Sequence, residues 1–245
     1  MAQKYVQTHE VSFFECDVNR TMTIPAILGV AIKASEIQSE ELGRGTAFIQ
    51  QFGLTWVVTS YVLEITRLPK VDERISISTK ATEYNKYFCY RQFWLHDQAG
   101  NELVMIEAVF SLMDIKKRKL SSVKEEIVSP YESQKIQRIK RFPKLATMQS
   151  DAKWSYRVRF NDIDSNQHVN NAVYLNWMFD VLGFDFLTTY TPKLVLIRFD
   201  KEVAYGQQVD SHFELTETGS GKKTSHEIRT GEQLNSVANI YWQKK

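Results

Sequence analysis

Apolar side chains recur at helical spacing in a segment near the start of the chain. The pattern runs from Ile24 to Ile37 and gives the expected helix one broad apolar face. Thr23 and Pro25 suit the start of this helix, and Gly43 suits its end. The first half of the chain is therefore expected to contain one long amphipathic helix.

The second half has the same order, in which a helix is followed by strands. Asn170 or Asn171 can cap a helix whose apolar positions share one face. These positions are Tyr174, Leu175, Trp177, Met178 and Val181. Segments rich in β-branched and aromatic residues predict strands after each helix. They lie at 74–84, 87–97 and 102–114 in the first half, and near 193–199, 210–218, 223–230 and 236–242 in the second.

The two halves are also related residue by residue. A shift of 147 residues aligns residues 11–28 with residues 158–175. The identities are Val11 with Val158, Phe13 with Phe160, Asp17 with Asp164, Asn19 with Asn166 and Leu28 with Leu175. Farther on, a shift of 134 residues aligns Ile65 with Phe199 and Ile75 with Val209. Such an internal repeat predicts two copies of one structural unit.

One helix per copy, followed by an antiparallel meander, indicates an α+β fold in which a sheet wraps around a central helix. This is the hotdog arrangement, and two copies in one chain predict a double hotdog. We expect residues 1–115 to form the first hotdog domain and residues 151–245 the second. Residues 116–150 are rich in charge and poor in large apolar side chains, so we expect a linker there. A homodimer of the whole chain is left open.

The composition is that of an ordinary globular protein, with 43% hydrophobic residues. The chain has no run of about 20 apolar residues, and its start lacks the apolar core of a signal peptide. We therefore expect a cytoplasmic protein with no membrane partner. Two cysteines, Cys16 and Cys89, cannot form a disulfide framework, and no Cys/His cluster offers a zinc site. We expect neither a metal nor a cofactor.

The net charge is only +2, but basic residues crowd the stretch from Lys116 to Lys144. They are Lys116, Lys117, Arg118, Lys119, Lys135, Arg138, Lys140, Arg141 and Lys144. Such a patch suits either an acidic partner or a solvated linker. No nucleic-acid motif accompanies it, so we do not expect a nucleic-acid partner.

Amides, acids and a histidine are concentrated between Arg159 and Asp180, directly before the second apolar helix. Helix capping explains part of this pattern, since Asp164 or Asn166 could bond the free N–H groups of the first turn. A cap needs one such residue rather than several. The segment therefore also indicates chemistry.

Residues 164–171, DSNQHVNN, resemble the signature D-x-N-x-H-V-N-N of plant and bacterial acyl-acyl-carrier-protein thioesterases, a double-hotdog family. The likeness continues through Tyr174 and Trp177, and extends over nearly the whole chain. Residues 197–209, IRFDKEVAYGQQV, look like the family's second motif. The resemblance implies hydrolysis of fatty acyl thioesters, with acyl carrier protein as partner. It also implies the catalytic set Asp164, Asn166, His168 and Glu202.

One departure from the family concerns the residue after this glutamate. The family motif commonly has cysteine there, whereas this chain has Val203. Cys16 and Cys89 lie outside both motifs. We therefore expect hydrolysis without a thiol.

Attack of water on a thioester requires a base, donors for the oxyanion and a proton for the departing sulfur. Asp164 or Glu202 could orient His168 or activate water, and Asn166 could position the water or the carbonyl. The N–H groups at the start of the helix could also bind the oxyanion. A transient anhydride through Asp164 stays open.

The first copy lacks half of this catalytic set. Its residues at the positions of Asp164, Asn166, His168 and Glu202 are Asp17, Asn19, Thr21 and Leu68. We expect a catalytically silent copy that holds the acyl chain. Candidates for lining an acyl tunnel, or for ordinary core packing, are Phe52, Trp56, Tyr61 and Trp94.

Three other functions are compatible with parts of this pattern. Hydrolysis of acyl-coenzyme A would use the same chemistry on a different carrier. A hotdog hydratase or dehydratase spaces Asp and His by five residues, whereas Asp164 and His168 are four apart. A non-catalytic acyl-thioester sensor would not need the complete Asp, Asn, His and Glu set.

Overall fold

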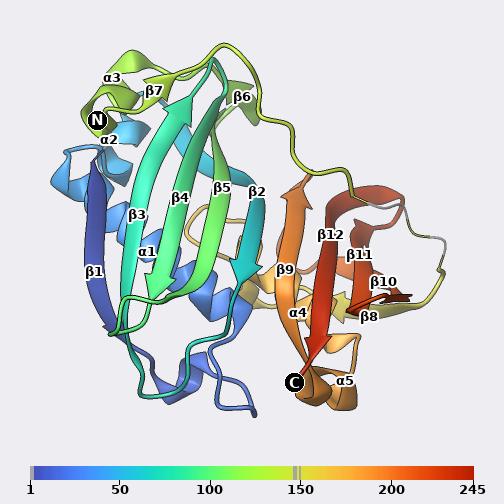
Figure 1. Ribbon diagram of the computed structural model, residues 1–245. Helices are drawn as coiled ribbons and strands as arrows, with labels where there is room; N and C mark the ends of the chain where they lie inside the picture. The colour runs from blue at the N-terminus through green and yellow to red at the C-terminus, as the bar shows by residue number, and fades with distance from the viewer. Residues whose placement is uncertain (1–2, 146–147, 149) are drawn as a thin grey trace.

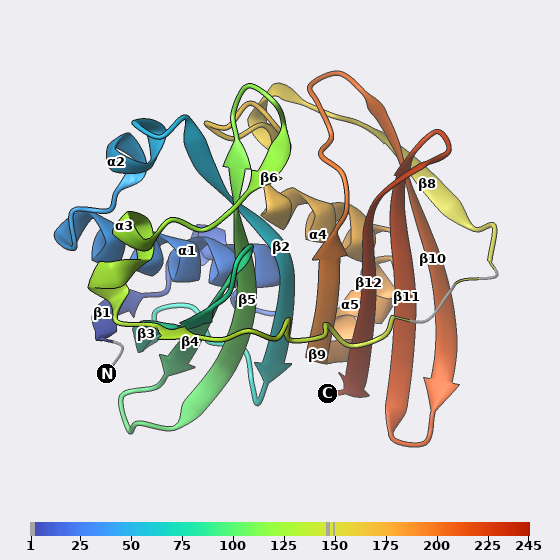
Figure 2. The same cartoon turned by 90° about the horizontal axis from the view of Figure 1, so that it is seen from above.

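Two helices lie on the same side of one continuous sheet (Figures 1 and 2). The computed structural model describes residues 3–145, 148 and 150–245. The two helices, α1 (Ile24–Glu41) and α4 (Asn171–Asp180), pack against each other near the middle of the molecule. Shorter helices are α2 (Thr46–Gln50), α3 (Glu125–Val128) and α5 (Phe184–Thr189).

The sheet joins strands from both halves of the chain. They are β1 (Lys4–Glu10), β2 (Leu54–Ile65), β3 (Arg74–Tyr84), β4 (Phe88–His96), β5 (Glu102–Asp114), β6 (Lys119–Ser121), β7 (Gln134–Lys135), β8 (Lys153–Arg157), β9 (Tyr190–Phe199), β10 (Gln208–Thr218), β11 (Gly221–Thr230) and β12 (Gln233–Lys244). Among the described residues their order is β1-β3-β4-β5-β2-β9-β12-β11-β10-β8, with β6 beside β5 and β7 beside β3. The halves meet where β2 pairs with β9. The predicted α+β double hotdog is confirmed.

Both helices begin where the sequence predicts. The Thr23 hydroxyl caps α1 by accepting a hydrogen bond from the backbone N–H of Ala26, and Pro25 lies in the first turn. The side chain of Asn170 caps α4 by accepting from the N–H of Ala172 at 2.9 Å. These caps fix the direction in which the chain enters each helix, and therefore the position of the turn before it.

The apolar faces of α1 and α4 are buried against the sheet in one core shared by both halves. Its members include Ile27 and Leu28 on α1, and Leu175 and Met178 on α4. A smaller core lies under α2 and α3. Within the described ranges, no helix is long and apolar enough to cross a membrane.

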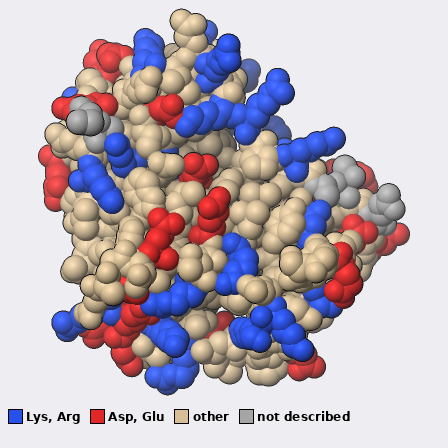
Figure 3. Space-filling model, in the orientation of Figure 1, with Lys and Arg blue, Asp and Glu red and all other residues tan. Residues whose placement is uncertain are grey.

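Residues 116–150 begin against the first half of the sheet. This stretch contains β6, α3 and β7, and its residues 146, 147 and 149 lie outside the described residues. The connection after β7 passes over the ends of the strands on the side away from α1 and α4 (Figures 1 and 2). Lys140 in this connection forms an ion pair with Glu83 of β3. Lys and Arg side chains lie over the upper part of that face, and others lie along its lower part (Figure 3).

Candidate active site

The turn before α4 is closed by its own hydrogen bonds. The carboxylate of Asp164 accepts from the backbone N–H of Asn166 at 2.8 Å, and the Asp164 N–H donates to the carbonyl of His168 at 2.9 Å. Gln167 adopts a left-handed conformation with φ of 67°. This local geometry directs the side chains of Asp164, Asn166 and His168 toward one cavity, which all three line.

The second motif is fixed beside this turn by backbone contacts. The N–H of Val169 donates to the carbonyl of Val203 at 3.0 Å. The buried amide of Asn235 donates to the carbonyls of Lys201 and Glu202, at 3.4 and 3.3 Å. As a result, Glu202 Oε2 lies 3.1 Å from His168 Nε2. The structure therefore pairs two of the expected site residues.

Arg118 also lies in this site, a role that no motif in the sequence indicates. It follows β5 in a turn in which Asp114 accepts hydrogen bonds from the N–H groups of Lys116 and Lys117. The guanidinium forms an ion pair with Glu202, and its Nη2 lies 3.3 Å from His168 Nε2. A residue of the first half thus reaches the His168–Glu202 pair of the second. Figure 2 shows the β5–β6 turn beside the segment that precedes α4.

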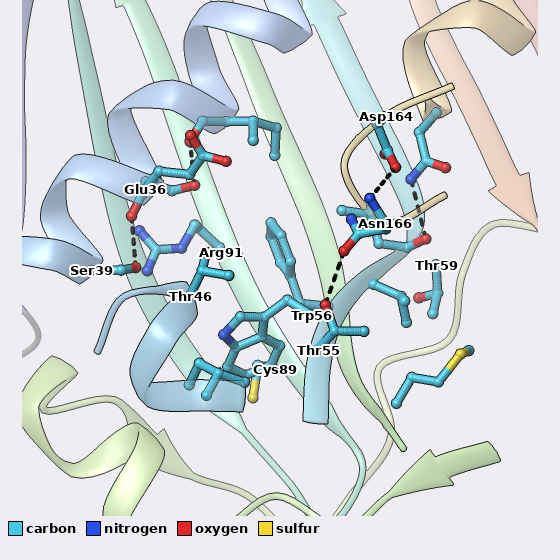
Figure 4. A pocket seen from close by; sticks show the side chains of 18 of the residues that line it. Glu36, Ser39, Thr46, Thr55, Trp56, Thr59, Cys89, Arg91, Asp164 and Asn166 are labelled. Carbon is cyan, nitrogen blue, oxygen red and sulfur yellow. Dashed lines mark hydrogen bonds between the residues drawn. The ribbon is translucent and has the colours of Figure 1, made fainter. Parts of the chain in front are cut away.

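Asn166 is likewise fixed by the first half of the chain. The Thr55 hydroxyl, at the start of β2, donates to Asn166 Oδ1 at 3.2 Å (Figure 4). This bond orients the amide so that its nitrogen has no partner among the described residues. The Asn166 NH₂ group is therefore free to donate to a ligand.

Asp164 is close to the pair without contacting it. Among the described residues its side chain hydrogen-bonds to the backbone N–H of Asn166 and not to His168. Asp164 therefore lines the same cavity as His168 and Glu202 without being bonded to either side chain.

The same turn occurs in the first copy, 147 residues earlier in the chain. The Asp17 carboxylate accepts from the N–H of Asn19 at 2.9 Å, as Asp164 does from Asn166. Further equivalent bonds are Asp17 N–H to Thr21 carbonyl, and Met22 N–H to Pro69 carbonyl. The backbone of the site is therefore duplicated, but His168 and Glu202 have Thr21 and Leu68 as their counterparts.

The cavity that contains these side chains has a volume of about 1250 Å³ and extends under α1. Trp56 and Tyr61, two of the expected tunnel residues, line it. Phe52 instead packs with the smaller core, and the Trp94 ring lies against Lys4. Most of its lining residues come from the first half. Asp164 and Asn166, from the second half, lie together on one side of it (Figure 4).

Neither cysteine contacts the His168–Glu202 pair. Cys89 lines the cavity, where burial raises the pKa of its thiol to about 12, so the thiol stays protonated at neutral pH. Cys16 lies in the first-copy turn, and burial raises its pKa as well. Val203 is 0% exposed and belongs to the large core. Within the described residues, no cluster of three His, Cys, Asp or Glu side chains could bind a metal ion.

Family models match both halves of the chain. The acyl-ACP thioesterase N-terminal domain matches residues 2–131, and the acyl-ACP thioesterase C-terminal domain matches residues 145–244. A solved Lactobacillus plantarum protein, provisionally assigned as an oleoyl thioesterase, is 36% identical over 99% of this chain and 97% of its own, with a TM-score of 0.95. The 12:0-ACP thioesterase of Umbellularia californica has the same fold, at 20% identity and a TM-score of 0.86 over 99% and 98% of the two chains.

Plant proteins are similar over most of this chain but are longer. An acyl-[acyl-carrier-protein] hydrolase, FATB3 of Cuphea viscosissima, is 27% identical over 70% of this chain and 45% of its own length. The oleoyl-acyl carrier protein thioesterase 2 of Arabidopsis thaliana is 22% identical over 84% of this chain and 62% of its own length. The chain thus spans about half to three fifths of these relatives.

Proposed function

The chain belongs to the acyl-ACP thioesterase family, and on that basis we propose that it hydrolyses fatty acyl thioesters of acyl carrier protein to free fatty acids. The observation that carries this proposal is the His168–Glu202 pair, 3.1 Å apart, in the lining of a cavity of about 1250 Å³. A base in the wall of a cavity of this size suits a substrate with one reactive group and a long chain.

In the proposed mechanism, Glu202 orients His168 through its contact with Nε2, and His168 takes a proton from the attacking water. The Asp164 carboxylate holds this water on the attacking side. The Asn166 NH₂ group, oriented by Thr55, donates to the oxyanion as the carbonyl becomes tetrahedral. Collapse of the intermediate breaks the carbon–sulfur bond, and His168 returns the proton to the sulfur.

The first copy is proposed to bind the acyl chain without taking part in the chemistry. Its turn lacks a histidine and an acid at the positions of His168 and Glu202, whereas α1 and β2 supply much of the cavity wall. The products expected are therefore a fatty acid and a free carrier thiol.

The direct test is steady-state hydrolysis of matched acyl groups on acyl carrier protein, on coenzyme A and on a small uncharged thiol, over a series of chain lengths. The proposal expects release of fatty acid, with the highest kcat/KM on the carrier protein. Equal or higher kcat/KM on coenzyme A would assign the enzyme to that carrier, and no hydrolysis of any thioester would overturn the proposal.

Arg118 is proposed as a positioning residue that acts through Glu202. The ion pair is about one-third exposed, so removing it is expected to lower kcat only about three- to tenfold in Arg118→Met. KM should change little, and Arg118→Lys should restore part of the rate because it keeps a positive charge. An unchanged kcat in the methionine variant would show that the ion pair has no part in catalysis.

The thiols are expected to be dispensable. A Cys16→Ser/Cys89→Ser protein should retain at least about half of the wild-type kcat, because both thiols remain protonated at neutral pH and neither contacts the pair. Steady-state hydrolysis with and without an alkylating reagent measures this. Complete loss of rate in the folded double variant would revive a thiol mechanism.

An acidic carrier is proposed to dock at the β5–β6 turn, where Lys116, Lys117 and Lys119 are exposed next to Arg118. Changing these three lysines to glutamine should raise KM for acyl carrier protein roughly three- to tenfold, since exposed charges act mainly on encounter. The salt dependence of KM should weaken and kcat should stay nearly constant.

The basic connection supplies a matched control for this docking surface. Neutralising Arg138, Lys140, Arg141 and Lys144 removes similar charge from the connection after β7, which passes the sheet on the side away from α1 and α4 (Figures 1 and 2). This set should change KM less than the turn set does. A larger effect from the connection, or an equal effect on a small uncharged thioester, would refute docking at the turn.

A further inference from the structure

Arg91 is buried in the same cavity as His168, at a distance from the reacting groups. It lies on β4, is 8% exposed and lines the cavity under α1. Figure 4 shows Arg91 on the opposite side of the cavity from Asp164 and Asn166, with Trp56 between them. One strand, β5, lies between β4 and β2 in the sheet, so β4 and β2 are about 10 Å apart.

The side chains that the guanidinium contacts among the described residues are neutral. Its Nη1 donates to Gln38 Oε1 at 2.6 Å and to Thr79 Oγ1 at 3.0 Å. The Tyr131 ring centroid is 5.3 Å from the guanidinium carbon, and Ser39 holds the Tyr131 hydroxyl at 2.8 Å. Among the described residues, no carboxylate lies within 4.0 Å of Arg91, and its Nε and Nη2 have no hydrogen-bond partner.

Burial of this charge has consequences for any chain that enters the cavity. Burial lowers the pKa of Arg91 to about 10, and the group therefore remains charged at neutral pH. A buried charge is unfavourable unless it is paired and hydrogen-bonded. A methyl terminus placed here would displace water from the free N–H groups and return no hydrogen bond. A carboxylate would supply both the acceptor and the opposite charge.

We propose that Arg91 forms a binding site for a carboxylate at the far end of the acyl chain, so that thioesters of α,ω-dicarboxylic acids are substrates. This inference rests on the proposed thioester hydrolysis, because it concerns the chain that enters the same cavity. Glu36 and Glu40 also line the cavity, but both are exposed on α1, whereas Arg91 is buried. The site would be built from Arg91, with Tyr131 and Gln38 holding the guanidinium in place.

Binding of free acids tests the site without requiring turnover. Calorimetry on the full chain would compare a monocarboxylic acid with the α,ω-dicarboxylic acid of the same length, over a series of lengths. At the length that reaches Arg91, the diacid is expected to bind roughly 10- to 100-fold more tightly. If the monoacid binds as tightly as the diacid at every length, the proposal is wrong.

Substitution of Arg91 identifies the group responsible. Arg91→Met should abolish the preference for the diacid and leave or improve binding of the monoacid, while Arg91→Lys should retain part of the preference. Arg44→Met is the matched control, because Arg44 also lines the cavity but donates to the carbonyls of Gly43 and Glu126. An unchanged preference in folded Arg91→Met, or its loss in Arg44→Met, would overturn the assignment.

Hydrolysis of thioesters then separates this inference from the function on which it rests. Wild-type protein and Arg91→Met should both hydrolyse a plain acyl thioester, whereas the ω-carboxylated thioester should lose kcat/KM roughly 10- to 100-fold in the variant. Hydrolysis of plain thioesters with no preference for the ω-carboxylated chain would refute the Arg91 site alone. Tighter binding of the diacid without hydrolysis of either thioester would refute the thioesterase and retain the site.

Discussion

Replacing His168 with alanine is expected to lower kcat about 10²- to 10⁴-fold while the fold persists. The imidazole is the proposed base, and Glu202 contacts it at 3.1 Å. The turn that carries His168 is closed by backbone bonds and by Asp164, so it does not depend on the imidazole. Steady-state rates on an acyl thioester measure the loss, and thermal melting shows that the variant is folded.

The first copy provides a control for this variant. Thr21 occupies the position of His168 in the equivalent turn, so Thr21→Ala should leave the rate nearly unchanged. Glu202→Gln should also lower kcat. Because Glu202 acts through His168, the double variant His168→Ala/Glu202→Gln should have a kcat little below that of His168→Ala alone. A folded His168→Ala protein with a normal rate would remove His168 from the mechanism.

Much of the fold could be predicted from the sequence because its signals are local. The strands expected at 74–84 and 102–114 coincide with β3 and β5, and Thr23 and Asn170 cap the helices as expected. β2 was not among the predicted strands. Its sequence, LTWVVTSYVLEI, has little alternation of polar and apolar residues, and most of its residues on both faces are buried or half-buried. A strand without one clearly exposed face does not show the period of two that marks a strand in the sequence.

The contacts that complete the site were beyond sequence reasoning because they connect distant positions. Arg118 is 84 residues from Glu202, and Thr55 is 111 residues from Asn166. Arg118 stands in the run KKRK, which has the composition of a solvated loop. Only the β5–β6 turn and the pairing of β2 with β9 bring these side chains across to the second half. Motif spacing thus predicts which residues share a turn, whereas the pairing of strands determines which distant side chains contact that turn.

Asp164→Asn is expected to lower kcat about 10²-fold, because it removes the charge proposed to hold the attacking water. Asparagine keeps a side-chain oxygen that can accept from the Asn166 N–H, so the turn should persist. The substitution therefore separates the two roles of Asp164, which are building the turn and presenting a charge to the cavity. Steady-state kinetics with a melting curve for each variant measures both.

Asp17→Asn is the matched control, because Asp17 makes the same bond to Asn19, at 2.9 Å, in a turn without His168 or Glu202. The two variants should change the melting temperature by similar amounts, since each alters one equivalent turn. Only Asp164→Asn should change the rate. If Asp164→Asn hydrolyses thioesters at nearly the wild-type rate, the Asp164 carboxylate only closes its turn, as Asp17 does in the first copy. Activation of water would then belong to His168 and Glu202 alone.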